Sequence, residues 1–125
     1  MIQLKRVYEK PEPHDGARFL VERLWPRGLH KADVQMDGWQ KEAGPSDQLR
    51  KWFSHDPEKW TGFQRKYFAE LDARPEAWDP ILKAAEHGTL TLLYSSHDTE
   101  HNNAVALKRY VEAKLAHPSA TVVHH

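Results

Sequence analysis

Two arginines flank a rigid bend early in the chain, and their chemistry suits the capture of an anion. Arg23 and Arg27 stand on either side of Trp25-Pro26, and Gly28 follows. A guanidinium group presents a planar fork of donors that matches a carboxylate or a phosphate, and an indole ring adds a flat stacking surface. The alternative is structural, with Arg23 paired to an acid, Trp25 in the core and Arg27 solvated. The residues alone leave both interpretations open.

A second polar segment, Ser95 to Asp98, follows an apolar run and precedes an expected helix. Backbone N–H groups at a helix N-terminus point outward and favour negative charge, so this segment has the geometry of an anion cradle. It lacks the glycines that let a backbone approach phosphates closely. Its spacing therefore favours a simpler interpretation, in which Asp98 or Thr99 caps the helix and the two following asparagines, Asn102 and Asn103, satisfy first-turn donors.

Three histidines are candidates for chemistry. His97 and His101 are four residues apart beside Asp98, a spacing that would let them share a metal ion if both were helical. The sequence offers no evident third ligand, so we predict no metal site. His55 follows an apolar helix and could act as a general acid or base, or simply end that helix.

Composition excludes several classes of function. The chain has 125 residues, equal numbers of basic and acidic side chains (18 each) and no cysteine, which excludes thiol nucleophiles, disulfides and cysteine-ligated zinc. Zero net charge argues against diffuse attraction to nucleic acid or anionic membranes. No apolar run approaches the ~20 residues that span a bilayer. We therefore expect a cytoplasmic protein with no membrane partner.

Nucleic acid is disfavoured on a second ground. The five tryptophans lie among lysines and arginines, a mixture that can stack single-stranded bases. Acidic side chains accompany them, however, and each aromatic residue has another at helical spacing, so a charge-balanced core is the better interpretation. No helix-turn-helix pattern with a basic recognition helix is present.

Hydrophobic patterning predicts an α/β domain. Residues 2–8 and 19–24 read as strands joined by a surface loop over 9–16, and residues 90–94 form a strand apolar enough to be buried on both faces. A short helix is expected to begin within residues 36–40 and must end before Pro45. The order of elements predicts a small parallel sheet covered by helices in one compact layered domain, with strands 19–24 and 90–94 parallel in one sheet.

Capping signals place the later helices. Ser46-Asp47 and Asp56-Pro57 are expected helix starts, and Asp79-Pro80 repeats the second pattern. That last helix should end at Gly88 in a left-handed cap. A final amphipathic helix over 104–115 should pack on the sheet. We assign residues 1–118 to a single domain and 119–125 to a disordered tail, and we exclude His124 and His125 from site reasoning.

Several motifs together resemble the bacterial YeaO-like branch of a domain of unknown function, over roughly residues 2–116. The resemblance rests on Lys5-Arg6-Val7-Tyr8, Asp15-Gly16 with Arg18, Val21 to Gly28, Trp39 to Glu42, Pro45-Ser46, Leu49-Arg50, and Leu90 to Tyr94 with Asn103. It implies a compact α/β domain with a small parallel sheet, and no established activity. Longer relatives in the wider superfamily carry a Cys-His-Arg segment after the last core strand. This chain has Ser95 to Asn103 there, which puts thiol chemistry in doubt.

The fold and the resemblance select the same strand ends, because ligands of open α/β sheets bind beyond the carboxyl ends of the strands. We predict a pocket there for a small anionic ligand or phosphorylated metabolite, with the reaction, if there is one, left open. The predicted ligand-binding residues are Arg23, Trp25, Arg27, Lys41, Arg50, Tyr94 and Asn103. His55 and Tyr94 are the candidates for proton transfer.

The three arginines of the predicted pocket should lie close together. Arg23, Arg27 and Arg50 should surround one concave surface, with at least one of them paired to a carboxylate, since uncompensated guanidinium groups repel. The alternative function is an interaction or regulatory module that binds protein or nucleic acid through an Arg/Trp surface. The sequence identifies no cofactor and leaves the oligomeric state open.

Overall fold

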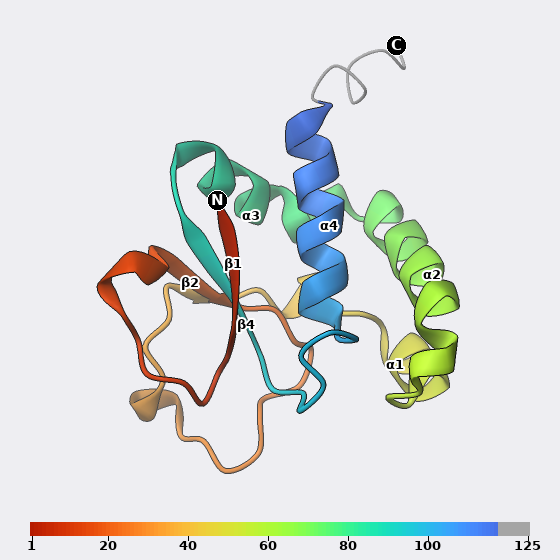
Figure 1. Cartoon of the computed structure of the whole chain (residues 1–125), viewed down its shortest axis with the longest axis horizontal. Helices are drawn as coiled ribbons and strands as arrows, with labels where there is room; N and C mark the ends of the chain where they lie inside the picture. The colour runs from red at the N-terminus through yellow and green to blue at the C-terminus, as the bar shows by residue number, and fades with distance from the viewer. Residues whose placement is uncertain (118–125) are drawn as a thin grey trace.

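The computed structural model describes residues 1–117, so the predicted tail lies outside the described residues. It contains one four-stranded sheet in which every pairing is parallel, with the order β1-β4-β2-β3 (Figure 1). The strands are β1 (Ile2–Arg6), β2 (Ala17–Leu20), β3 (Gly38–Trp39) and β4 (Leu90–Tyr94). The predicted α/β class with a small parallel sheet is confirmed.

Strand β4 lies at the centre of the sheet, between β1 and β2. All five of its residues are buried, which explains its run of apolar side chains. Strands β2 and β4 pair in parallel, as predicted, and Phe19 lies opposite Leu92. The strand predicted over 19–24 is shorter, however, and ends at Leu20. Beyond it the backbone leaves the sheet, and Leu24 is exposed.

Four α-helices follow: α1 (Asp47–Phe53), α2 (Trp60–Ala73), α3 (Pro75–His87) and α4 (Asn103–Ala116). Two of the predicted starts are confirmed. The Ser46 side chain accepts a hydrogen bond from the Leu49 N–H, and Asp56 accepts one from the Glu58 N–H in a 3-10 turn that leads into α2. Other 3-10 turns span Pro13–Asp15, Lys31–Asp33 and Lys41–Ala43.

The predicted layer of α-helices covers one face of the sheet. The main core joins alternate β4 residues, such as Leu90 and Leu92, to the helices. The opposite face, with Leu20 and Leu93, is covered by Trp25, Trp39 and other side chains of the long segment between β2 and α1. Figure 1 shows this segment and the helices on different sides of the sheet.

Three local predictions are wrong. Residues 36–40 form no helix, because Gly38–Trp39 instead pairs with the open edge of β2. Helix α3 starts at Pro75 rather than at Asp79, so Pro80 lies inside it. The cap of α4 is Asn102, which accepts from the Val105 N–H, rather than Asp98 or Thr99.

Gly88 does follow the end of α3, as predicted, but its φ of 164° is extended backbone rather than a left-handed cap. Helix α4 closely matches the predicted range of 104–115 and packs on β4 and β1, which completes the expected strand-helix unit.

Candidate anion-binding cleft

A cleft of about 650 Å³ lies at the carboxyl edge of the sheet. The segments that leave β1, β2 and β4 line it, together with the end of α1 and the start of α4. Its walls include six of the residues predicted from sequence, namely Arg23, Trp25, Arg27, Arg50, His55 and Asn103. Parallel strands end at one edge, so residues far apart in sequence meet there.

The three arginines stand around this one concave surface, as predicted, but they are not equivalent. Arg23 is tied into the fold: its Nε donates to the Pro45 carbonyl and its Nη2 to the Gly44 carbonyl, both at 3.0 Å. Its Nη1 also lies 3.4 Å from a Glu42 carboxylate oxygen. The guanidinium of Arg23 therefore fastens the segment after β2 to the segment before α1.

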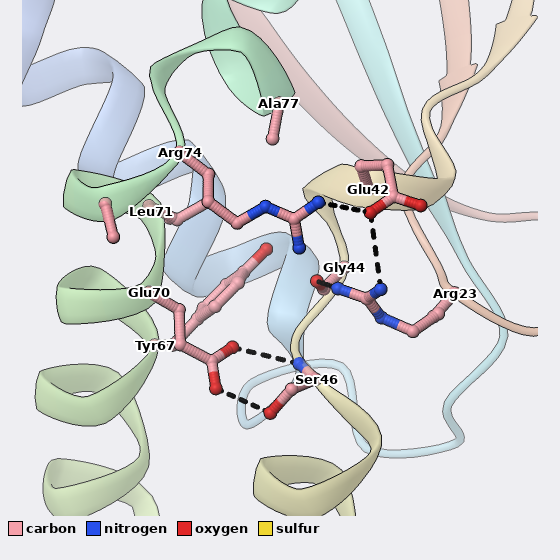
Figure 2. Close-up of a pocket in the computed structure, with 10 residues that line it drawn as sticks. Arg23, Glu42, Gly44, Ser46, Tyr67, Glu70, Leu71, Arg74 and Ala77 are labelled. Carbon is pink, nitrogen blue, oxygen red and sulfur yellow. Dashed lines mark hydrogen bonds and ion pairs between the residues drawn. The ribbon is translucent and has the colours of Figure 1, made fainter.

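Arg23 also lines a second cavity of about 250 Å³, shown in Figure 2. Glu42 bridges Arg23 and Arg74 there, with 2.6 Å to the Arg74 guanidinium. Glu70 accepts hydrogen bonds from both the N–H and the hydroxyl of Ser46. The polar groups that line this cavity bond to one another, so we assign it a structural role in joining α1, α2 and the segment before α1.

Arg27 and Arg50 retain donors for a ligand. Within residues 1–117 the exposed Arg27 side chain makes no hydrogen bond or ion pair, although its carbonyl accepts from the Tyr8 hydroxyl. Arg50 donates from Nη2 to Asp47 at 3.0 Å, and its buried Nε has no partner in the described part of the chain. Lys51, beside it on α1, is also exposed to the cleft and in no ion pair among these residues.

Trp25 and Asn103 line the cleft from fixed positions. The Trp25 indole N–H donates to the Leu29 carbonyl at 2.6 Å, and its ring packs edge-on against Trp39 with centroids 5.3 Å apart. Asn103 donates from Nδ2 to the Val21 carbonyl at 2.6 Å, which ties the first turn of α4 to the segment leaving β2. Both side chains are held by these contacts before any ligand arrives.

Lys41 and Tyr94 do not line the cleft, which leaves two of the predicted ligand contacts without geometric support. The Lys41 ammonium lies 5.4 Å from the centre of the Trp39 ring, on the loop side of the sheet. Tyr94 is buried in the helix-side core, and burial raises its pKa. Of the two candidates for proton transfer, His55 alone reaches the cleft.

Glu22 is a cleft residue that sequence reasoning missed. Its carboxylate accepts hydrogen bonds from the N–H and the hydroxyl of Ser95, at 2.6 and 2.7 Å. Burial raises the pKa of Glu22, while the Ser95 hydrogen bonds and the charges of His55 and Arg50 act to lower it. An acidic residue directly before Arg23, at a strand end, was the available signal.

His97 and His101 do not come together with a third ligand in the described part of the chain. His101 lies 3.0 Å from Asp98 through Nδ1 and meets the Trp60 ring edge-on. His97 also borders the cleft. Within residues 1–117, neither belongs to a set of three ligating groups close enough to share an ion.

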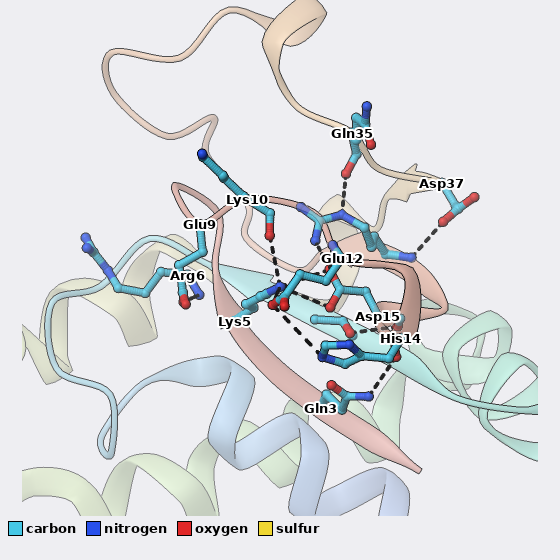
Figure 3. Close-up of polar contacts among 12 residues, drawn as sticks. Gln3, Lys5, Arg6, Glu9, Lys10, Glu12, His14, Asp15, Gln35 and Asp37 are labelled. Carbon is cyan, nitrogen blue, oxygen red and sulfur yellow. Dashed lines mark hydrogen bonds and ion pairs between the residues drawn. The ribbon is translucent and has the colours of Figure 1, made fainter.

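One such set does occur elsewhere, at Glu12, His14 and Asp15 (Figure 3). Lys5 donates to both carboxylates and Arg18 to that of Asp15, so cations of the chain already supply the positive charge there. Burial acts to raise the pKa of Asp15, but hydrogen bonds from the Glu12 N–H, Lys5 and Arg18 outweigh it and hold the pKa at about 2. The cluster is a structural anchor for the loop between β1 and β2.

Comparison with known proteins agrees with the resemblance drawn from the motifs. A family model described as the inactive DUF488-N3 subclade, DUF488-N3i, matches residues 1–123. The chain belongs to this family.

Similar proteins carry no assigned activity in their names. "Uncharacterized protein YeaO" of Escherichia coli K12 is 41% identical over 112 residues, which cover 90% of this chain and 97% of that protein. "Uncharacterized protein Rv3073c" of Mycobacterium tuberculosis H37Rv is 43% identical over 70 residues, 56% of this chain and 59% of the relative. No solved structure matches the chain significantly.

None of the helices in the described range combines the length and the apolar character that a membrane crossing requires.

Proposed function

We propose that this protein binds a small anionic ligand, such as a phosphorylated metabolite, in the cleft at the carboxyl edge of its sheet. The observation that carries the proposal is the set of uncommitted donors there. The Arg27 guanidinium has no partner within the described residues, and the buried Nε of Arg50 has none either. An unpaired buried donor costs free energy, and an anionic ligand would relieve that cost.

The balance of charge in the cleft also favours an anion. Arg27, Arg50 and Lys51 face one acidic side chain among the lining residues, that of Glu22, which is already bonded to Ser95. The cavity volume lies in the range of small-molecule sites, about 300 to 1,000 Å³. Trp25 offers an apolar surface beside the cations for the rest of the ligand.

A binding role without turnover is the form of the function that we favour. The matching subclade is described as inactive, and the chain has no cysteine to serve as a nucleophile. His55 and the half-buried Glu22 are the titratable groups of the cleft that we favour for a catalytic version.

Thermal denaturation with a ligand panel tests the proposal. The panel contains inorganic phosphate, sugar phosphates, nucleoside monophosphates, carboxylates, oligonucleotides and divalent metals. A ligand at one hundred times its Kd stabilises the folded state by about 2.7 kcal/mol, which is easily measured as a shift in melting temperature. We expect small phosphorylated compounds to raise the melting temperature of the parent and to raise that of Arg27→Ala by a clearly smaller amount at the same concentration.

Arg65→Ala provides a matched control, because Arg65 is an exposed arginine on α2 that does not line the cleft. It should respond to ligand like the parent. Stabilisation by oligonucleotides alone would instead support the interaction-module alternative. Equal loss of response in both arginine variants would indicate diffuse charge attraction and would refute a specific pocket.

A further inference from the structure

The turn that ends α1 has an unusual backbone for its residue types. Ser54 and His55 adopt φ angles of 46° and 57°, and they are the two non-glycine residues with positive φ in the described range. Side chains other than hydrogen crowd the backbone in this left-handed region, so each residue is strained. The chain uses glycine for positive φ at Gly16 and Gly28. Two consecutive exceptions therefore need a reason.

The fold requires the turn but not these side chains. The backbone hydrogen bonds that close it run from the Ser54 N–H to the Arg50 carbonyl and from the Asp56 N–H to the Phe53 carbonyl, at 3.0 and 2.9 Å. Glycine would make the Ser54 bond equally well. Within residues 1–117 neither the Ser54 hydroxyl nor the His55 ring forms a hydrogen bond, and both residues are exposed.

Neighbouring residues hold the turn in place, and of its two side chains the His55 ring adds a tilted contact with the Phe53 ring, with centroids 6.4 Å apart. Phe53, immediately before it, is buried and stacks on Phe63 with ring centroids 4.4 Å apart. Asp56, immediately after it, caps the next 3-10 turn through its own carboxylate. A packed core can hold a strained backbone in this way, and such strain concentrates at binding sites.

Both side chains open onto the cleft. Ser54 and His55 line it together with Arg50 and Lys51 of the preceding helix. The turn thus adds a hydroxyl and an imidazole to the guanidinium and ammonium groups already there. The cleft is therefore lined by five side chains with hydrogen-bond donors that other described residues leave partly or wholly unpaired. These are Arg27, Arg50, Lys51, Ser54 and His55.

We propose that the Ser54-His55 turn is a strained ligand-contacting element that donates hydrogen bonds to the oxygens of a phosphate monoester. This inference rests on the proposed anion-binding function and narrows its ligand. A carboxylate has two oxygens, whereas a phosphoryl group has three strong acceptor oxygens and about twice the charge. The number of donors in the cleft matches a phosphoryl group better than a carboxylate. These donors are the Arg27 guanidinium, the Arg50 Nε, the Lys51 ammonium, the Ser54 hydroxyl and the His55 ring.

Glycine substitutions in the turn distinguish the effect of backbone strain on stability from the effect of side-chain contact on ligand binding. Ser54→Gly and His55→Gly keep the left-handed backbone and remove the side chain, so each variant should melt at the same temperature as the parent or higher. Each should bind phenyl phosphate and inorganic phosphate at least fivefold more weakly in calorimetric titrations. Acetate should bind the parent more weakly than phosphate. His87→Gly, at an exposed histidine outside the cleft, controls for a general loss of histidine.

The outcomes are distinguishable. If phosphate binding depends on Arg27 but survives both glycine variants unchanged, the turn is not a contact and only this inference fails. If acetate binds as tightly as phosphate, the assignment of the ligand class is wrong. If the parent binds none of these anions, the proposed function fails with it.

A variant that keeps more of the original side chain covers the case of misfolding. Should the glycine variants unfold, the strain argument is wrong. His55→Ala, which removes the donors of the ring but keeps Cβ, then tests the contact alone. Parent-like phosphate affinity in this variant would overturn the contact as well, and weakened affinity with an unchanged melting temperature would support it.

Discussion

Replacing Arg23 and Arg27 in parallel tests whether two arginines of one bend perform different tasks. Arg23→Met keeps most of the length and apolar volume of the side chain but removes its donors. The carbonyls of Gly44 and Pro45, both on buried residues, then lose their partners. Arg27→Ala removes a guanidinium that has no partner within the described residues.

The magnitude for Arg23 follows from those two bonds. Hydrogen bonds to a charged group contribute about 1.5 to 3 kcal/mol each, and partial access of water to the vacated site reduces the sum. We expect Arg23→Met to lower the free energy of unfolding by about 2 to 4 kcal/mol. The ion pair with Glu42 adds little, because Glu42 is half-exposed and keeps Arg74 as a partner.

For a domain of this length, each kcal/mol corresponds to roughly 4 °C in melting temperature, so Arg23→Met should melt roughly 8 to 16 °C below the parent. Arg27→Ala should melt within about 2 °C of it, as a surface substitution does. The assays are thermal denaturation and urea titration of parent and variants without ligand, followed by titration with phosphate. The reasoning is refuted if Arg27→Ala is the unstable variant while its ligand affinity matches that of the parent.

Three further predictions address binding, backbone and pH. Arg27→Ala should weaken binding of any anionic ligand found in a screen by about 1.5 to 3 kcal/mol, roughly 10- to 150-fold, and Arg27→Lys should recover only part of it because the charge remains and the fork is lost; calorimetry measures both. Gly16→Ala should lower the free energy of unfolding by more than about 3 kcal/mol in urea titration, because φ is +65° and the new Cβ would lie 2.0 Å from the Thr89 carbonyl oxygen. Gly28→Ala should cost only about 1 kcal/mol, because φ is +77° but nothing lies within 4 Å of the new Cβ. Equal costs for the two variants would contradict the steric argument. The pKa of Asp15 is lowered from 3.8 to about 2, so its contribution to stability should be complete above about pH 4 and disappear as pH falls toward 2, a step that urea titrations should show in the parent and not in Asp15→Asn.

Elements with local signals could be predicted from the sequence alone. The unbroken burial of β4 is visible in its leucines, and the caps at Ser46 and Asp56 follow from side chains that bond to the nearest N–H groups. Because parallel strands end at one edge of a sheet, these elements also indicated where a cleft would form.

Other elements depended on partners that no local pattern reveals. Residues 38–39 become a strand only because the edge of β2 offers hydrogen bonds to them. Helix α3 continues through Pro80 because Trp78 is anchored by its indole N–H to the Leu71 carbonyl and packs in the core, which offsets the one backbone bond that proline cannot make.

The sequence also could not show which cleft residues bond to other parts of the protein and which remain available to a ligand. Arg23 and Arg27 have the same side chain four residues apart, yet one meets the carbonyls of residues 44 and 45 and the other meets solvent. Tyr94 sits at the expected strand end but faces the helix side of the sheet. Distant backbone atoms determine which donors are already satisfied, and only the donors left over can serve a ligand.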